Sequence, residues 1–166
     1  MSDLRVVEVE FEHPDSAALR AAQRAEIDAR YGRADTEPGP APSTADITVF
    51  YVAYRDGEPV GCAGIRQLDG QHGEIKRMFV APRSRGTGVS TALLGALENF
   101  ARTAGWERLV LETGDAQPDA VRFYEREGYT RIPNFGYYAE AEDSLCYEKV
   151  LFATDPAAET GCEGCE

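Results

Sequence analysis

The stretch RSRGTGVSTAL (Arg83–Leu93) decides the fold of this chain, because it joins a glycine-rich turn to the start of an apolar helix. Glycine at positions 86 and 88 lets the backbone approach an anion closely, since a Cβ there would keep phosphate oxygens away. The backbone N–H groups of residues 85–90 would point at one spot, aided by the positive end of the following helix. The stretch therefore predicts a phosphate-binding loop, with a glycine turn that only caps a helix as the alternative.

Of two common phosphate loops, the first is excluded by this stretch and the second matches it weakly. A Walker loop needs a lysine directly before the Ser or Thr at the helix start, whereas Val89 precedes Ser90 here. A dinucleotide-binding fingerprint needs a third small residue and a parallel strand–helix–strand unit, whereas Thr91 stands at the third position and the preceding strands indicate an antiparallel arrangement, so this match is weak. A pyrophosphate that lies on backbone N–H groups is the third reading.

The segments around the loop predict a mixed α/β chain. Three runs rich in β-branched and aromatic residues, ITVFYVAYR, VGCAGIRQL and EIKRMFV, precede the loop with tight turns between them, which indicates an antiparallel meander. A helix near residues 89–104 follows, and then a strand, a short helix near 119–127 and two more strands. An earlier helix is expected to be capped by Asp15 or Ser16 and to end at Gly32.

The composition of the chain limits the classes of partner that we expect. The chain has 166 residues, enough for one domain with a core, and 29 acidic against 17 basic residues give a net charge of -12. A nucleic-acid binder usually carries the opposite charge, so we expect no nucleic-acid partner. No run approaches the roughly 20 apolar residues of a membrane span, and the N-terminus has no apolar signal core. We expect a soluble cytoplasmic protein without a membrane partner.

The positions of the four cysteines do not indicate a metal site. Cys62 and Cys146 lie in apolar, strand-like surroundings, which is typical of buried thiols. Cys162 and Cys165 supply half of a zinc site, and neither histidines nor a second pair lie near them in the sequence. We expect no metal, one domain over residues 1–152, and a flexible acidic tail over 153–166.

The motif Arg83-x-x-Gly86-x-Gly88 resembles the Arg/Gln-x-x-Gly-x-Gly/Ala signature of the GNAT N-acetyltransferase superfamily. The strand EIKRMFV and the helix AVRFYEREGY resemble that superfamily in the right order, so the resemblance covers roughly residues 49–151. It implies a central, mostly antiparallel mixed sheet that splays at a cofactor wedge and is flanked by about four helices. It also implies that the loop holds the pyrophosphate of acetyl-CoA. The combination of LETG, QP and RIPNFGYY resembles a bacterial subgroup of small-molecule acetyltransferases.

The resemblance implies a site along the strand that ends at Val80. The pantetheine arm would pair with free backbone groups of Met78 and Val80, and a backbone N–H near Val80 would meet the oxyanion. Tyr124 would donate a hydrogen bond to the departing thiolate, although a helix aromatic packed on the sheet is its alternative reading. The expected cofactor-binding residues are Met78, Phe79, Val80, Arg83, Arg85, Gly86, Thr87, Gly88, Val89, Ser90 and Gln117.

Glu74 is the first candidate for the general base, directly or through a water. It matches a position where some histone-acetylating members of the superfamily carry a catalytic glutamate. A solvated glutamate at the edge of a strand is the alternative. His72, in a turn, and Glu112, at the end of a strand, are further candidates.

The acceptor is expected beside the loop PNFGYYAEAED, which places Phe135, Tyr137 and Tyr138 next to carboxylates. Aromatic rings with carboxylates suit a primary amine, although aromatics tucked onto the core are the alternative. The sequence thus predicts direct acetyl transfer from acetyl-CoA to a small-molecule amine. A protein or peptide acceptor, or an acyl-CoA sensor without turnover, remains open. The resemblance also allows a homodimer.

Overall fold

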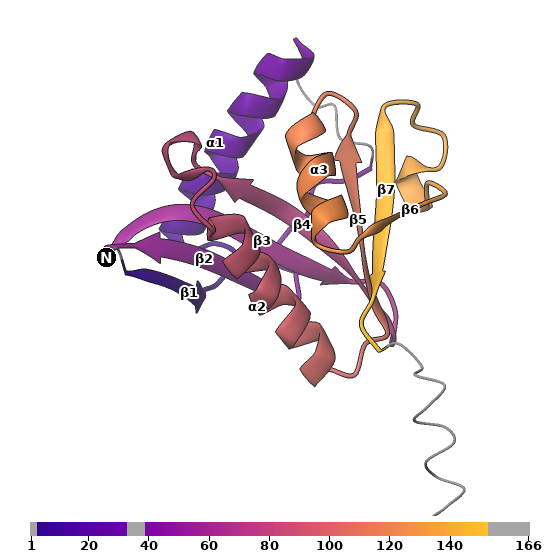
Figure 1. Ribbon diagram of the computed structural model, residues 1–166, viewed down its shortest axis with the longest axis horizontal. Helices are drawn as coiled ribbons and strands as arrows, with labels where there is room; N and C mark the ends of the chain where they lie inside the picture. Colours follow the sequence, from indigo (N-terminus) through magenta and orange to yellow (C-terminus); the bar gives the residue numbers. More distant parts are fainter. Residues whose placement is uncertain (1–2, 33–38, 153–166) are drawn as a thin grey trace, which may run out of the picture.

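The chain forms a seven-stranded mixed sheet in the order β1-β2-β3-β4-β5-β7-β6 (Figure 1). The computed structural model describes residues 3–32 and 39–152. The strands are β1 (Leu4–Glu8), β2 (Val49–Arg55), β3 (Glu58–Gln67), β4 (His72–Val80), β5 (Arg108–Gly114), β6 (Thr130–Ile132) and β7 (Ser144–Val150). The β4–β5 pair is parallel, and the other pairs of this sheet are antiparallel. The predicted mixed, mostly antiparallel sheet is confirmed.

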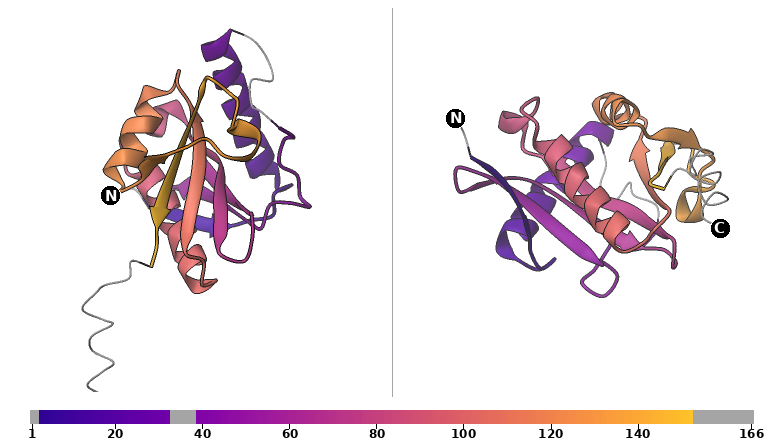
Figure 2. Two further views of the ribbon diagram at one scale, coloured as in Figure 1. Left: turned by 90° about the vertical axis from the view of Figure 1, so that its right-hand side faces the viewer. Right: turned by 60° about the horizontal axis from the view of Figure 1, so that its bottom comes forward.

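Helices cover both faces of the sheet (Figure 2). They are α1 (Pro14–Tyr31), α2 (Val89–Thr103) and α3 (Pro118–Arg126), with short 3-10 helices η1 (Pro82–Ser84) and η2 (Gly136–Tyr138). Helix α1 packs on one face, whereas α2 and α3 share a core cluster on the other. Within the described residues, no helix is both long and apolar enough to cross a membrane.

The described part of the chain holds three α-helices, so the expected number of about four was wrong. Residues 39–48, between α1 and β2, are turns and irregular structure. Pro40 and Pro42 agree with this, because proline lacks an N–H donor and disfavours helix at the residue before it. The expected tail over 153–166, with Cys162 and Cys165, lies outside the described residues.

The start of α1 also differs from the expectation that Asp15 or Ser16 caps it. His13 is the cap, and its Nδ1 accepts a hydrogen bond from the Asp15 N–H at 3.1 Å. Ser16 is buried inside the first turn, where its hydroxyl donates to the Phe11 carbonyl at 2.7 Å. The predicted end at Gly32 is confirmed by its left-handed conformation, with φ of 69°.

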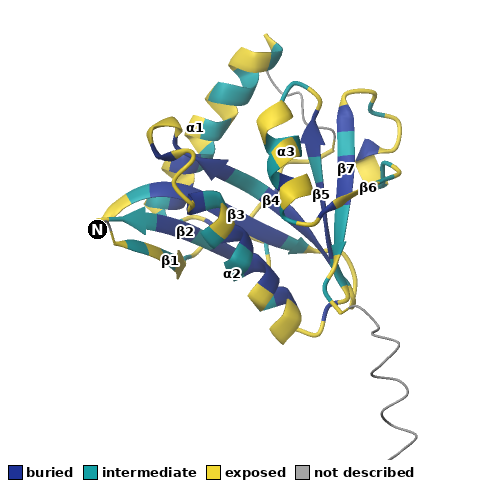
Figure 3. Cartoon of the chain, viewed as in Figure 1, coloured by how far each residue is buried: buried dark blue, intermediate teal, exposed yellow. Residues whose placement is uncertain are grey.

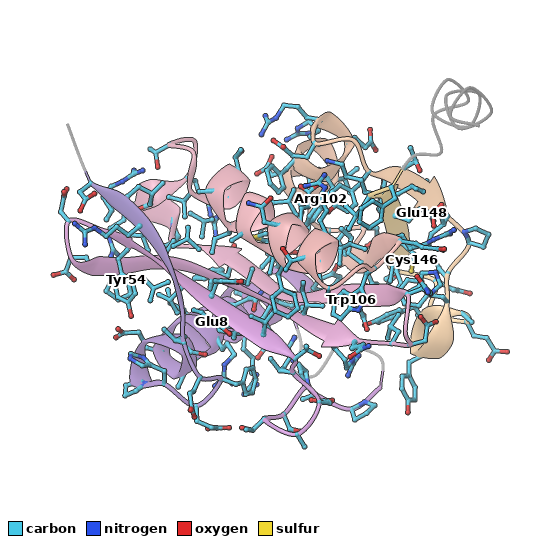
Figure 4. The ribbon with its side chains drawn as sticks, turned by 90° about the horizontal axis from the view of Figure 1, so that it is seen from below. Glu8, Tyr54, Arg102, Trp106, Cys146 and Glu148 are labelled. Carbon is cyan, nitrogen blue, oxygen red and sulfur yellow. The ribbon has the colours of Figure 1, made fainter. Side chains whose placement is uncertain are left out.

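The core lies on the two sides of the central strands (Figure 3). The apolar face predicted for the second long helix is confirmed, since Leu93, Leu94 and Leu97 of α2 are each 1% exposed or less. On the other face, Tyr54 of β2 reaches α1, and its hydroxyl donates to Asp15 at 2.6 Å (Figure 4). Cys62 and Cys146 are buried thiols, as predicted.

The central feature is a fork between β4 and β5. The two strands pair only over residues 72–74 and 108–110. From Ile75 to Val80, β4 has β3 as its strand partner on one side and, among residues 3–32 and 39–152, no paired strand on the side of β5. A β-bulge opposite Cys62 and Gly64 holds Arg77 at φ of 60°, which is rare for a residue with a side chain. The fork leaves an open edge of β4 beside the predicted phosphate loop.

Two glycine-to-alanine variants should shift stability in opposite directions. A Cβ at Gly64 would lie 2.9 Å from the Val49 carbonyl oxygen and 2.5 Å from the Phe50 ring. We expect Gly64→Ala to lower the free energy of unfolding by about 1–3 kcal/mol, because the strand backbone must shift. Gly95 lies inside α2 with no atom within 4 Å of its Cβ position. Gly95→Ala should raise the free energy of unfolding by about 0.5–1 kcal/mol.

Urea denaturation of both variants beside the parent chain checks this. Equal stability of Gly64→Ala and the parent chain would contradict the tight approach of β3 to β2.

Candidate active site

A groove of about 590 Å³ runs beside the open edge of β4, between α1, α3 and the glycine-rich loop. Most of the predicted cofactor residues line it, namely Met78, Phe79, Val80, Arg85, Gly86, Gly88, Val89, Ser90 and Gln117. These residues are brought together from β4, from the loop that follows it, from the start of α2 and from the N-cap of α3. The structure thus gathers them on one elongated surface.

The glycine-rich loop has the backbone geometry that an anion needs. Gly86 and Gly88 have φ of 74° and 91°, the left-handed region that glycine adopts without strain. No atom lies within 4 Å of the Cβ position of either residue, so the space in front of the loop is open. Gly88 is the N-cap of α2 and brings no capping side chain, which leaves the first N–H groups of the helix for a ligand. The loop therefore fits a pyrophosphate.

Two predicted cofactor residues do not line the groove. The exposed side chain of Arg83 approaches the Pro59 carbonyl, with 3.5 Å between Nη2 and oxygen. The Thr87 hydroxyl accepts a hydrogen bond from Arg55 at 2.7 Å and donates to the Ser84 carbonyl. Thr87 thus anchors the loop to β2, and direct contact of either side chain with the cofactor stays a prediction.

Arg85 ties the loop to two other elements. Its Nε donates to the Val80 carbonyl at 3.0 Å, and its Nη2 lies 2.8 and 2.7 Å from the two carboxylate oxygens of Glu26 on α1. Glu26 also pairs with Arg30 at 3.1 Å. The arginine therefore joins the loop, the open edge of β4 and α1.

The carbonyls of Met78 and Val80 are not free, contrary to expectation. Gln23 of α1 donates from Nε2 to the Met78 carbonyl at 2.9 Å, and Arg85 occupies the Val80 carbonyl. A carbonyl oxygen has two lone pairs, so each can still accept a second hydrogen bond. The edge of β4 is available to a ligand, but it is shared with side chains.

The groove continues into a smaller cavity of about 170 Å³ at the fork. Gln23, Ile27, Met78, Gln117, Ala120 and Phe123 line both spaces. Charged side chains of both signs reach the cavity wall, with Lys76 and Arg77 from β4 and Glu112 and Asp143 from the side of β5 and β7. Such a wall suits a polar ligand that carries a charge.

Tyr124 of α3 lines this cavity and is 5% exposed. Its ring packs against Phe123 and Tyr129, with ring centroids 5.1 and 5.6 Å away. Burial raises the pKa of Tyr124, so the phenol stays protonated at neutral pH. The residue is both a packed aromatic and a hydrogen-bond donor at the cavity.

Tyr31 closes the cavity from the last turn of α1. Its hydroxyl accepts a hydrogen bond from the Ala116 N–H at 3.3 Å. A Cβ at Gly114 would overlap this hydroxyl, so the contact requires glycine there. Burial raises the pKa of Tyr31, and a side-chain hydrogen bond links it to Gln117. The helix α1 and the turn before α3 thus meet over the cavity.

Glu74 does not line either space. It is 2% exposed, accepts a hydrogen bond from Arg66 at 3.0 Å and another from the Tyr138 hydroxyl at 2.7 Å, and lies 3.7 Å from the Lys76 ammonium. The strand begins at His72, so Glu74 lies inside it and faces its β3 neighbour Arg66. Glu74 is neither a solvated carboxylate nor a group at the cavity, and a structural role explains its contacts.

The predicted acceptor residues lie together at η2 but outside the lining of the cavity. Tyr138 is 3% exposed and accepts a hydrogen bond from the Lys76 ammonium at 3.0 Å. Phe135 packs edge-on against Tyr138 at 5.4 Å, and Tyr137 is 66% exposed beside Gly39. Tyr138 therefore supports the cavity through Lys76, and direct contact of the three rings with an acceptor stays a prediction.

Two further site residues lie on α1 and were missed in the sequence. Gln23 and Tyr31 share one helix face with Ile27, because the three are four residues apart. Two polar side chains on an otherwise apolar stripe were the available signal. Among residues 3–32 and 39–152, no three His, Cys, Asp or Glu side chains gather to hold a metal ion.

Comparison with known proteins agrees with this geometry. Residues 16–129 match the model of the acetyltransferase (GNAT) family. The chain is 42% identical to an IAA acetyltransferase of Azospirillum brasilense over 61% of this chain and 67% of that protein. It is 39% identical to an aminoalkylphosphonate N-acetyltransferase of Salmonella typhimurium over 55% of this chain and 63% of that protein.

The fold also matches a crystal structure of a candidate acyl-CoA N-acyltransferase from Klebsiella pneumoniae. The TM-score is 0.75 at 31% identity, and the match covers 90% of this chain and 98% of that one. Proteins of this family use acetyl-CoA as the acetyl donor. The family match spans the phosphate loop, the open edge of β4 and Tyr124, and the chain therefore belongs to the GNAT family as an acetyl-CoA-dependent N-acetyltransferase.

Proposed function

We propose that the chain transfers the acetyl group to the primary amine of a small molecule that enters the cavity at the fork. The observation that carries this proposal is the cavity itself, which holds only about 170 Å³. Tyr31 closes its far side by contact with the turn before α3. Its size favours a small acceptor over a protein side chain on an extended surface. Two relatives are named for small-molecule acceptors, IAA and aminoalkylphosphonate.

Different residues of the groove would hold different parts of acetyl-CoA. The N–H groups of residues 86–90 would hold the pyrophosphate, and the open edge of β4 would hold the pantetheine arm. When bound, acetyl-CoA supplies the thioester that an amine attacks. Tyr124, protonated at neutral pH and placed at the cavity, would donate a hydrogen bond to the departing sulfur.

Glu112 is the carboxylate that we assign to the acceptor amine. It lies on β5 and lines the cavity together with Tyr124, whereas Glu74 lines neither the cavity nor the groove. A carboxylate at this place can bind the ammonium form of the acceptor and take its proton, directly or through a water. Asp143 lines the same wall and adds negative charge.

The first experiment follows the release of CoA from acetyl-CoA with a panel of small amines, including amino acids, aminoalkylphosphonates, polyamines and arylamines. Turnover with one chemical class would support the proposal and begin to define the acceptor. Turnover with basic peptides alone would instead support the protein acceptor. Tight acetyl-CoA binding, with no turnover of either the small amines or the basic peptides, would support an acyl-CoA sensor without turnover.

We expect Tyr124→Phe to lower kcat roughly 100- to 1,000-fold and to leave the dissociation constant for acetyl-CoA within about threefold of the parent value. Tyr129→Phe is the matched control, because its hydroxyl is buried without a partner among the described residues and does not line the cavity. Steady-state kinetics and calorimetry measure both effects. An unchanged kcat in Tyr124→Phe would remove the proposed donor.

We expect Glu112→Gln to lower kcat/KM for the amine about 100-fold at neutral pH, because the amide cannot accept the proton. The loss should shrink as the pH rises toward the pKa of the acceptor, where more of the amine is already unprotonated. Glu58→Gln, an exposed carboxylate at the β2–β3 turn, should leave the kinetics unchanged. A pH–rate profile of Glu112→Gln that parallels the parent profile would rule out Glu112 as the base.

A further inference from the structure

Gln23 stands at the junction of the two spaces described above. It lies in the middle of α1 and lines both the long groove and the cavity at the fork. Its side chain crosses from α1 to β4, where Nε2 donates to the Met78 carbonyl at 2.9 Å. Met78 is on the part of β4 that has parted from β5. The amide of Gln23 thus lies on the edge that a bound arm would follow.

The other end of this amide has no hydrogen-bond partner within the described part of the chain. The Oε1 atom of Gln23 is buried, and among the described residues nothing donates a hydrogen bond to it. The assignment of the two ends is determined by chemistry, because a carbonyl such as that of Met78 only accepts and must face the NH2 group. A buried acceptor without a donor is unfavourable, so the site favours a ligand that brings an N–H.

The pantetheine arm carries such groups. It contains two secondary amides, each with one N–H donor and one carbonyl acceptor, and an extended amide chain pairs with a strand edge as a strand does. Alternate carbonyls of a strand point to the same side, and those of Met78 and Val80 both meet side chains from outside the sheet. An arm on this edge passes directly by Gln23.

We propose that Gln23 is a positioning residue for the pantetheine arm: Nε2 stays on the Met78 carbonyl while Oε1 accepts an amide N–H of the arm. This inference rests on the proposed course of the arm along β4. The glutamine then serves as a short bridge that replaces part of the missing pairing with β5. It holds the arm and does not touch the reacting atoms.

The test compares CoA, which carries the arm, with adenosine 3′,5′-bisphosphate, which lacks both the arm and the second phosphate of the pyrophosphate. Calorimetry on Gln23→Leu should show a loss of affinity for CoA of roughly 3- to 10-fold, the value of one buried hydrogen bond, and an unchanged affinity for adenosine 3′,5′-bisphosphate. Gln23→Glu should weaken CoA at least as much, because a carboxylate cannot donate to the Met78 carbonyl.

Asn99→Leu, which replaces an exposed amide on α2, is the matched control and should leave both affinities unchanged. In steady-state kinetics, Gln23→Leu should raise KM for acetyl-CoA and leave KM for the amine as it is. Melting temperatures within the experimental error of the parent chain would show that the fold is retained.

Several outcomes would overturn the inference. Equal weakening of both ligands would mean that Gln23 supports the groove as a whole. An unchanged affinity for CoA would mean that Oε1 meets no donor on the arm. A higher KM for the amine, with CoA affinity retained, would assign Oε1 to the acceptor instead. A parent chain that binds adenosine 3′,5′-bisphosphate as tightly as CoA would contradict the proposed course of the arm and this inference with it.

Discussion

The short pairing between β4 and β5 is the constraint on which the rest of the site depends. The strands share three residue pairs, and then β4 continues to Val80 without β5. A parallel pair that stayed in register would close this edge with backbone hydrogen bonds and leave no place for an extended ligand. The fork supplies the open edge, the groove beside it and the cavity where the strands separate. The open edge, the groove and the cavity thus all depend on this fork in the sheet.

Buried charges stabilise the fork at the point where it opens. Glu74 is the last residue of β4 that pairs with β5, and its carboxylate binds Arg66 and the Tyr138 hydroxyl. Tyr138 in turn accepts a hydrogen bond from the ammonium of Lys76, a residue that lines the cavity. Buried charges require partners of this kind, because an isolated charge in the interior is very unfavourable. These hydrogen bonds connect η2, which lies in the loop between β6 and β7, to a residue of the cavity wall. The position of η2 therefore affects the shape of the cavity.

The features that the sequence predicted well are local. Gly86 and Gly88, the apolar face of α2 and the end of α1 at Gly32 each follow from residues a few positions apart, where backbone preferences act directly. Contacts between distant segments were not predictable from one sequence. Gln23 reaches Met78 across 55 positions, and the burial of Glu74 depends on a loop 64 positions later. Such side-chain hydrogen bonds leave no periodic pattern in the chain.

Hydrogen exchange on addition of CoA tests most directly whether acetyl-CoA lies along the fork. Binding along the fork predicts slower exchange in residues 78–90 and in the middle of α1, with no change in β1 or β6 at the edges of the sheet. Protection confined to the edge strands, or the absence of protection along β4 at saturating CoA, would contradict binding at the fork.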